Sequence, residues 1–134
     1  MTTSVVLDGP AAIEAHLSES ITLGERRQRG VRFVLCDPDN GVMVHCPVDD
    51  LPASLDPAEC AHTVSVFAEV LVAHGEPGAM LVVLTRPGSA IITAPDRVWY
   101  HAAHQVCVQH GVRLLGVYLL TPNDQRELTL DDAI

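Results

Sequence analysis

The residues best placed for chemistry follow an apolar run that ends at Leu84. They are two hydroxyls, an arginine, a glycine–serine pair and a carboxylate: Thr85, Arg86, Gly88, Ser89, Thr93 and Asp96. In an open α/β sheet, ligands bind beyond the carboxyl ends of parallel strands. A helix beginning near Thr93 would offer free N–H groups to an anion, and Arg86 would add charge. This loop is therefore the candidate ligand-binding site, and a small anion is its candidate ligand.

Two other interpretations of the same loop stay open. The loop matches no phosphate-binding fingerprint, and Asp96 would itself occupy the helix start, so an ordinary connection with a Thr93–Asp96 cap explains the same residues. A hydrolase centred on Arg86, Ser89 and Asp96 is the other alternative. Because no complete set of nucleophile, base and orienting group can be assembled from the sequence, we assign no catalytic residue and favour a protein that is not an enzyme.

The histidines and acidic residues raise the question of a metal. His101 and His104 stand three residues apart on one helix face, with His110 on the same side. A catalytic zinc wants a third ligand and a general base, and no H-E-x-x-H motif exists. The acidic cluster Asp49-Asp50, with Asp56 near it, is explained as a solvated loop. We therefore expect no metal and no cofactor.

The four cysteines do not form a recognisable zinc or redox motif. Cys36, Cys46, Cys60 and Cys107 include no C-x-x-C pair, and their spacings match no zinc ribbon or finger. They are expected to be reduced and mostly buried, with Cys46 the most exposed thiol.

Turn and apolar patterns predict the elements that must position these residues. Asp37–Gly41 carries the proline and Asn-Gly signals of a tight hairpin turn. Around it we expect strands at 31–36, 42–48, 79–84 and 112–120, a short strand at 90–92, and helices over 56–74 and from Thr93 to about His110. The run Ala79–Leu84 is apolar throughout, as a strand covered on both faces would be.

This order predicts a single α/β domain. Its mixed β-sheet consists of a hairpin and two strand–helix–strand units, with helices packed on its faces. Residues 1–30 hold an N-terminal helix and a polar connector, residues 31–124 the core domain, and residues 125–134 an acidic C-terminal tail that either frays or packs along an edge. Ile13, Leu17 and Ile21 form a narrow stripe, so the first helix must dock on something to be stable.

The helix over 56–74 is apolar on more than one side. Val66 and Val70 lie with His62 and Glu69 opposite its core face. A helix that is apolar on two sides is usually buried twice, so the second partner is either the N-terminal helix or another subunit. We predict an interface at these four residues and self-association, as a homodimer, or a protein partner.

Composition excludes several classes of function. The chain has 134 residues, with eight arginines, no lysine, seventeen acidic residues and a formal net charge of −9. Nucleic-acid binding and docking on anionic membranes both favour a basic face, so neither is expected. No apolar run approaches the ~18 residues of a membrane helix, and the first 23 residues lack the pattern of a secretion signal. We expect a cytoplasmic protein, and the bias toward Ala, Val, Asp and Arg suggests a GC-rich genome such as that of an actinobacterium.

Several short sequence segments resemble the RadC-like branch of the JAB/MPN metalloprotease-like fold. Leu35–Gly41 is similar to its strand–turn–strand opening, Ala79–Leu84 to its metal-bearing strand, and Leu114–Leu120 to its late glycine-containing strand. The resemblance covers roughly Val31 to Asp124, and it implies a site of the pattern His-x-His-Pro followed by Ser-x-x-Asp.

This chain departs from that pattern at the metal ligands. The matching stretch reads Leu84-Thr85-Arg86-Pro87, followed by Thr93-Ala94-Pro95-Asp96 with one residue fewer between. Leu84 and Arg86 replace the two histidines, and neither hairpin strand carries the glutamate that would act as general base. The resemblance therefore implies a degenerate site without zinc hydrolysis.

The stretch from Val48 to Pro52 and the elements after it are also similar to an uncharacterised actinobacterial domain family. That second resemblance implies a fold and no chemistry. Together these observations favour a non-catalytic interaction or regulatory domain, with an anion or small-molecule sensor or a hydrolase at residues 85–96 as the alternatives.

Overall fold

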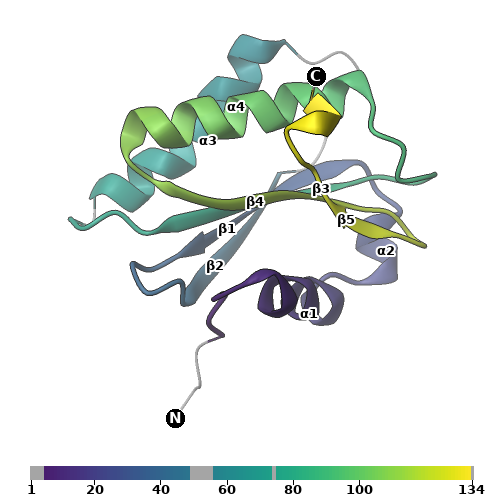
Figure 1. Cartoon of the computed structure of the whole chain (residues 1–134), viewed down its shortest axis with the longest axis horizontal. Coiled ribbons are helices and arrows are strands. Elements are labelled where there is room, and N and C mark those ends of the chain that lie inside the picture. The colour runs from purple at the N-terminus through teal and green to yellow at the C-terminus, as the bar shows by residue number, and fades with distance from the viewer. Residues whose placement is uncertain (1–4, 49–55, 74, 134) are drawn as a thin grey trace.

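The computed structural model describes residues 5–48, 56–73 and 75–133, and they form an α/β fold around a five-stranded mixed sheet (Figure 1). Strand β1 (Gly30–Cys36) pairs antiparallel with β2 (Val42–Val48) and with β3 (Ala79–Thr85). Strand β4 (Arg113–Leu120) is parallel to β3, and β5 (Gln125–Glu127) is antiparallel to β4. The strand order is therefore β2-β1-β3-β4-β5, and the predicted fold class is confirmed.

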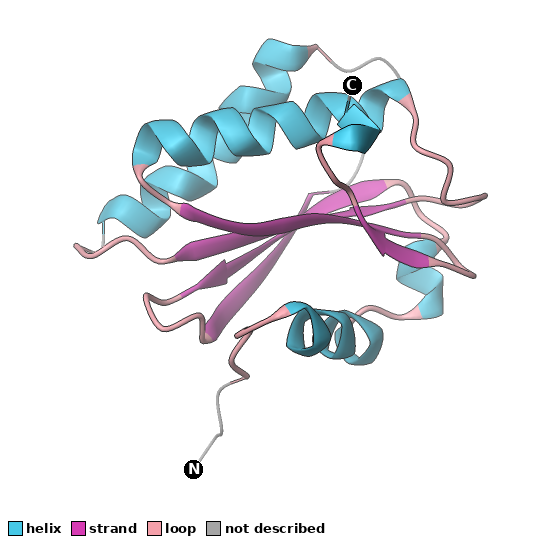
Figure 2. Cartoon of the chain, viewed as in Figure 1, coloured by secondary structure: helices cyan, strands magenta, loops and turns pink. Residues whose placement is uncertain are grey.

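The helices cover the two faces of the sheet unequally. Helices α3 (Pro57–Ala73) and α4 (Ala94–His110) lie together on one face, and α1 (Pro10–Ser20) lies on the other (Figures 1 and 2). Helices α3 and α4 belong to the two predicted strand–helix–strand units, β2-α3-β3 and β3-α4-β4. The short helix α2 (Leu23–Arg26) falls in the expected polar connector, where we predicted no helix.

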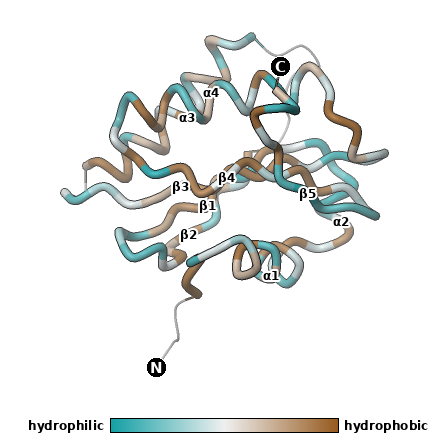
Figure 3. Tube along the Cα trace, viewed as in Figure 1, coloured by the Kyte–Doolittle hydropathy of each residue, from teal (hydrophilic) through white to brown (hydrophobic). Residues whose placement is uncertain are grey.

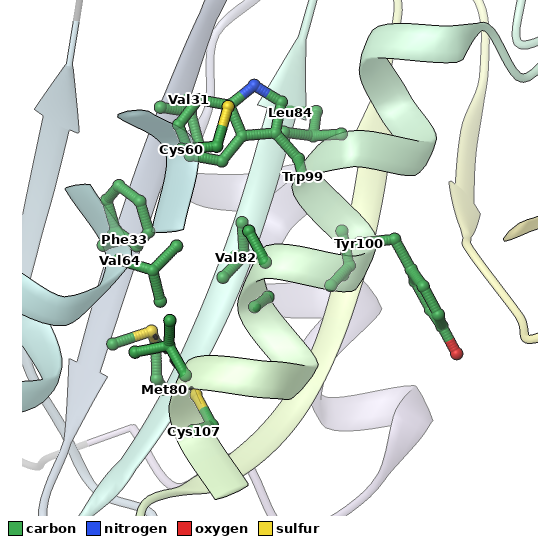
Figure 4. Close-up of a cluster of buried hydrophobic side chains, with 14 of the residues drawn as sticks. Val31, Phe33, Cys60, Val64, Met80, Val82, Leu84, Trp99, Tyr100 and Cys107 are labelled. Atoms are coloured by element: carbon green, nitrogen blue, oxygen red, sulfur yellow. Dashed lines mark hydrogen bonds between the residues drawn. The ribbon is translucent and has the colours of Figure 1, made fainter. Parts of the chain in front are cut away.

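The core consists of two layers, one on each side of the sheet. Between the strands and α3 and α4, Phe33 stacks on Phe67 with ring centroids 4.5 Å apart and meets Trp99 edge-on. Figure 4 shows Phe33 and Trp99 within this layer. On the other side, Ile13 and Leu17 of α1 pack against alternate residues of the strands. The first six residues of β3 are all buried, and Figure 3 shows how apolar residues concentrate in the central strands. The continuous apolar run therefore marks a strand covered on both faces, as predicted.

The local signals for turns and caps also match the structure. Asn40 adopts a positive φ of 66° in the hairpin turn, and Asp37 Oδ1 accepts hydrogen bonds from the backbone N–H groups of Asp39 and Gly41, at 2.9 and 2.8 Å. Gly111 ends α4 in the left-handed conformation, as the predicted stop. Asp56 Oδ1 accepts from Ala58 N at the start of α3. The acidic pair Asp49-Asp50 and the expected helix end at His74 lie outside the described residues.

The predicted short strand at Ala90–Ile92 is wrong. Residues 90–92 carry no regular secondary structure. The carbonyl oxygens on either side of Ala90 accept hydrogen bonds from the Arg86 side chain instead of from a neighbouring strand. The segment after Asp124 takes the edge-packed alternative, because β5 joins the sheet and Leu128 and Ala133 are buried in the core. None of the described helices is both long and apolar enough to cross a membrane.

Gly78 allows the segment before β3 to approach β1 closely. A Cβ atom at this position would lie 1.9 Å from the backbone oxygen of Cys36, so the two segments would have to separate. We predict that Gly78→Ala lowers the free energy of unfolding by about 2 kcal/mol or more, as overpacked sites do. Urea unfolding followed by circular dichroism measures the change.

Gly24→Ala is the matched control, since its Cβ would meet only Thr22 Oγ1 at an ordinary 3.8 Å. An equal effect of the two substitutions would contradict the close approach.

Candidate functional site

The loop after β3 brings together the six residues singled out in the sequence, and Arg86 organises it. The Arg86 side chain turns inward and the residue is 7% exposed. One of its terminal nitrogens donates to Ser89 O at 2.7 Å, and the other donates to Ile91 O at 2.6 Å and to Asp96 Oδ2 at 2.9 Å. Its backbone N–H donates to Leu120 O, which ties the loop to the end of β4. The guanidinium therefore closes the loop on itself and on the start of α4.

Asp96, in the first turn of α4, is the charged partner of Arg86. We call the Arg86 side chain and its acceptors, Ser89 O, Ile91 O and Asp96 Oδ2, the clamp. The same carboxylate oxygen that pairs with Arg86 also accepts a hydrogen bond from the backbone N–H of Thr93 at 2.9 Å. Asp96 is 5% exposed, so both charges of the pair lie inside the protein. Arg86 and the start of α4 are the two features that would attract an anion, and both already interact with the Asp96 carboxylate.

The remaining residues of the predicted site contribute less to this arrangement. Thr85 Oγ1 donates to Gln28 O, at 2.9 Å, and so holds the connector against the end of β3. Gly88 adopts a positive φ of 96° and Ser89 is exposed. Ser89 offers its carbonyl to Arg86, and its hydroxyl has no partner assigned among the described residues.

These contacts hold the loop in a fixed arrangement. Both terminal nitrogens of Arg86 are engaged, and its Nε is buried without an acceptor within the described part of the chain. This Nε–H thus faces the interior and not solvent. An incoming anion would have to displace Asp96 or the loop carbonyls. No base lies against the Ser89 hydroxyl in the described contacts.

The outer face of α3 has a different character. His62, Val66, Glu69 and Val70, the four predicted interface residues, are all exposed, and both valines keep 44% of their surface accessible. Val70 also lines a groove of about 350 Å³ together with Met43 and Val44 of β2 and Leu71 of α3. The face is therefore continuous with an apolar groove that the sequence did not indicate.

The histidines of α4 are engaged individually. His101 Nε2 contacts Ala133 O at 3.0 Å, and His110 Nδ1 contacts Val106 O at 2.9 Å. His104 lies against the ring of Tyr100, with centroids 4.4 Å apart. Over residues 5–48, 56–73 and 75–133, no group of three His, Cys, Asp or Glu side chains is arranged to hold a metal ion.

The cysteines behave as small apolar side chains. All four are free, three of them are buried, and Cys46 is the most exposed, as predicted. Burial raises the pKa of the Cys36, Cys60 and Cys107 thiols to about 11. Since the thiolate is the reactive form, these three positions are not candidate nucleophiles.

Sequence reasoning missed a polar cluster beneath β2. His16 of α1 and His45 of β2 bring their Nε2 atoms within 2.9 Å of each other, and Arg32 of β1 reaches the other nitrogen of His45. The two histidines are 29 residues apart, so no local pattern links them.

Comparison of the chain with protein-family models and with curated proteins found no match.

The buried pair in the loop gives a direct test of its structural role. We predict that Arg86→Met lowers the free energy of unfolding by about 3–5 kcal/mol, because it leaves the Asp96 carboxylate buried without its cation. Adding Asp96→Asn should recover part of this loss, since no charge is then left unpaired. Urea unfolding of the two single variants and the double variant measures the coupling.

Arg126→Met is the control, because the Arg126–Asp132 pair lies at the surface with side chains 41% and 19% exposed. Exposed pairs contribute little, so a loss equal to that of Arg86→Met would contradict the clamp.

Proposed function

We propose that the chain is a non-catalytic interaction domain that self-associates as a homodimer through the outer face of α3. The observation that carries this proposal is the apolar stripe of Val66 and Val70, which continues into the groove beside β2. Contiguous apolar patches on a protein surface are typical of interaction sites. The buried clamp at Arg86 supports the non-catalytic part, because it engages the most reactive residues of the loop.

The helix and the edge strand contribute to one surface. Val66 and Val70 are four residues apart and therefore lie on the same side of α3, with His62 one turn before them. Met43 and Val44 of β2 are 56% and 45% exposed and line the groove with Val70. Asp37 and Glu76 also line the groove and place acidic groups beside its apolar part.

Side-chain packing, rather than extension of the sheet, is the mode of contact that this surface favours. Strand β2 lies at the edge of the sheet, but its first residues are already paired. Val42 N donates to Val5 O at 2.8 Å, and Val6 forms a bridge with Gly41. Pro47 further along the strand has no N–H to offer. A guarded edge of this kind protects against pairing with another strand.

A second copy of the chain fits the face by symmetry and charge. In a two-fold dimer the same patch meets itself, so each contact between unlike residues occurs twice. Two α3 helices crossing antiparallel near Val66 would bring His62 of one copy opposite Glu69 or Val70 of the other. Valine would then meet valine at the centre, and an imidazole would meet a carboxylate at each side. Each chain has a net charge of −9, and this arrangement avoids placing two carboxylates against each other.

The proposal includes a degenerate JAB-like site and a cytoplasmic location. Thr93 and Asp96, which match the Ser-x-x-Asp of the RadC-like pattern, act here in the clamp and the helix start. Four free cysteines are typical of proteins in a reducing compartment.

The oligomeric state tests the proposal directly. We expect native mass spectrometry and light scattering of the purified protein to give a dimer of twice the 14.4 kDa chain. Val66→Ala together with Val70→Ala should raise the dissociation constant at least about tenfold, since each buried valine contributes on the order of 1.5 kcal/mol or more.

Val108→Ala is the matched control. Val108 is a valine 80% exposed on α4, a different helix from the one that carries the proposed face, and its truncation should leave the dimer unchanged. A monomer at micromolar concentration, or an equal effect of the control, would overturn the proposal. Native spectra taken with and without a chelator also reveal any bound metal.

A further inference from the structure

A hydrogen-bonded chain of side chains joins α1 to the sheet beneath β2. His16 Nε2 and His45 Nε2 are 2.9 Å apart, and their ring centroids are 5.1 Å apart with the planes at 61°. On the far side of His45, Arg32 NH1 lies 3.2 Å from Nδ1. Three elements, α1, β2 and β1, therefore meet through one line of polar groups on the face of the sheet opposite to α3 and α4 (Figure 1).

Because arginine can only donate hydrogen bonds, it determines which nitrogen of each imidazole carries the proton. A guanidinium only donates hydrogen bonds, so His45 Nδ1 must accept from Arg32. The proton of a neutral His45 then lies on Nε2 and is donated to His16 Nε2. His16 in turn carries its own proton on Nδ1. Both contacts are satisfied only when both rings are neutral.

An added proton has no acceptor among the side chains of Arg32, His45 and His16. If His16 is protonated, its Nε2–H faces the Nε2–H of His45. If His45 is protonated, its Nδ1–H faces the donor of Arg32. Either event replaces an attraction with a contact between two donors. A metal ion is also disfavoured between the two rings, because the nitrogen that His45 would offer already carries its proton.

The charged groups around the pair are few. Glu25 of α2 pairs with Arg32 of β1 and favours the charged form of His45, as Glu19 of α1 does for His16. Burial outweighs both effects and lowers the pKa of each histidine below the ordinary 6.5, and for His45 the charges of His16 and Arg32 add to the lowering.

We propose that the contact between His16 and His45 is an acid-sensitive latch, which holds α1 against the sheet at neutral pH and releases it when His16 is protonated. Release would expose Ile13 and Leu17 of α1 and Ile21 directly after it, which are all at most 4% exposed. It would also uncover Val34 and Leu81, which lie in the layer that α1 covers. Acid would thereby present a new apolar surface for a partner. This inference does not rest on self-association, since α3 lies on the other face.

The expected direction with pH follows from proton linkage. When the folded pKa of a histidine lies below its unfolded value, the unfolded or released state binds more protons. The stabilisation is therefore fully present above about pH 6.5 and is lost as the pH falls from there through the lower folded values. The latch should be closed at neutral pH and open under mildly acidic conditions.

Amide hydrogen exchange of α1 tests the latch in the full chain. We expect the protection of residues 13–21, corrected for intrinsic exchange, to fall about tenfold between about pH 7.5 and about pH 5.5, while the amides of α4 change much less. His16→Gln should remove most of this response. Its amide oxygen accepts from His45 Nε2–H whether His45 is neutral or charged, so α1 stays attached.

His104→Gln is the matched control, because burial also lowers the pKa of His104 but that residue lies on α4. It should keep the wild-type response of α1. Unchanged protection of α1 over this pH range in the wild-type protein, or an identical response in His16→Gln, would overturn the proposal. An NMR titration of the wild-type imidazoles gives a second measurement that needs no variant, and a pKa above 6.5 for His16 would also overturn the proposal.

Discussion

Burial of β3 on both faces is the constraint from which the rest of the architecture follows. Its first six residues are inaccessible to solvent, and it pairs with β1 on one side and β4 on the other. A strand of this kind is stable only if both faces of the sheet are covered. The crossovers β2-α3-β3 and β3-α4-β4 place two 17-residue helices on one face, which leaves the other face to α1, a helix of 11 residues.

This imbalance explains why polar contacts gather under the sheet. A short helix with a narrow apolar stripe is marginal alone, and α1 buries chiefly Ile13 and Leu17, with Ile21 directly after it. Its attachment is reinforced by His16 against His45 and by Gln125, whose side chain donates to Glu14 O from beyond β4. In our proposal, the face with the smaller apolar contact is therefore the one whose cover depends on protonation, while α3 and α4 are held on the other face by a larger apolar layer and by the Arg86–Asp96 pair.

Local patterns were sufficient for most of the fold. The apolar run of β3, the Asn-Gly turn and the glycine that ends α4 each act within a few residues, and each was predicted correctly. Long-range features were beyond such patterns. Nothing near His16 indicates that it meets a histidine on β2. The sequence also placed Arg86 and Asp96 in one loop, but their types alone do not say whether the charges face solvent or each other, and this orientation separates a ligand site from a structural clamp.

The inward orientation of Arg86 also bears on where function lies. In open α/β folds the ends of the parallel strands are the usual place for ligands, and here the clamp fills that place with its own cation and carboxylate. A buried pair is costly to open, since separation would leave each charge unpaired in a poorly solvated environment. The two surfaces for which we propose a function therefore lie away from this loop, on the flanks of the sheet. One flank presents the apolar face of α3, and the other presents α1, which is held in place by two neutral imidazoles.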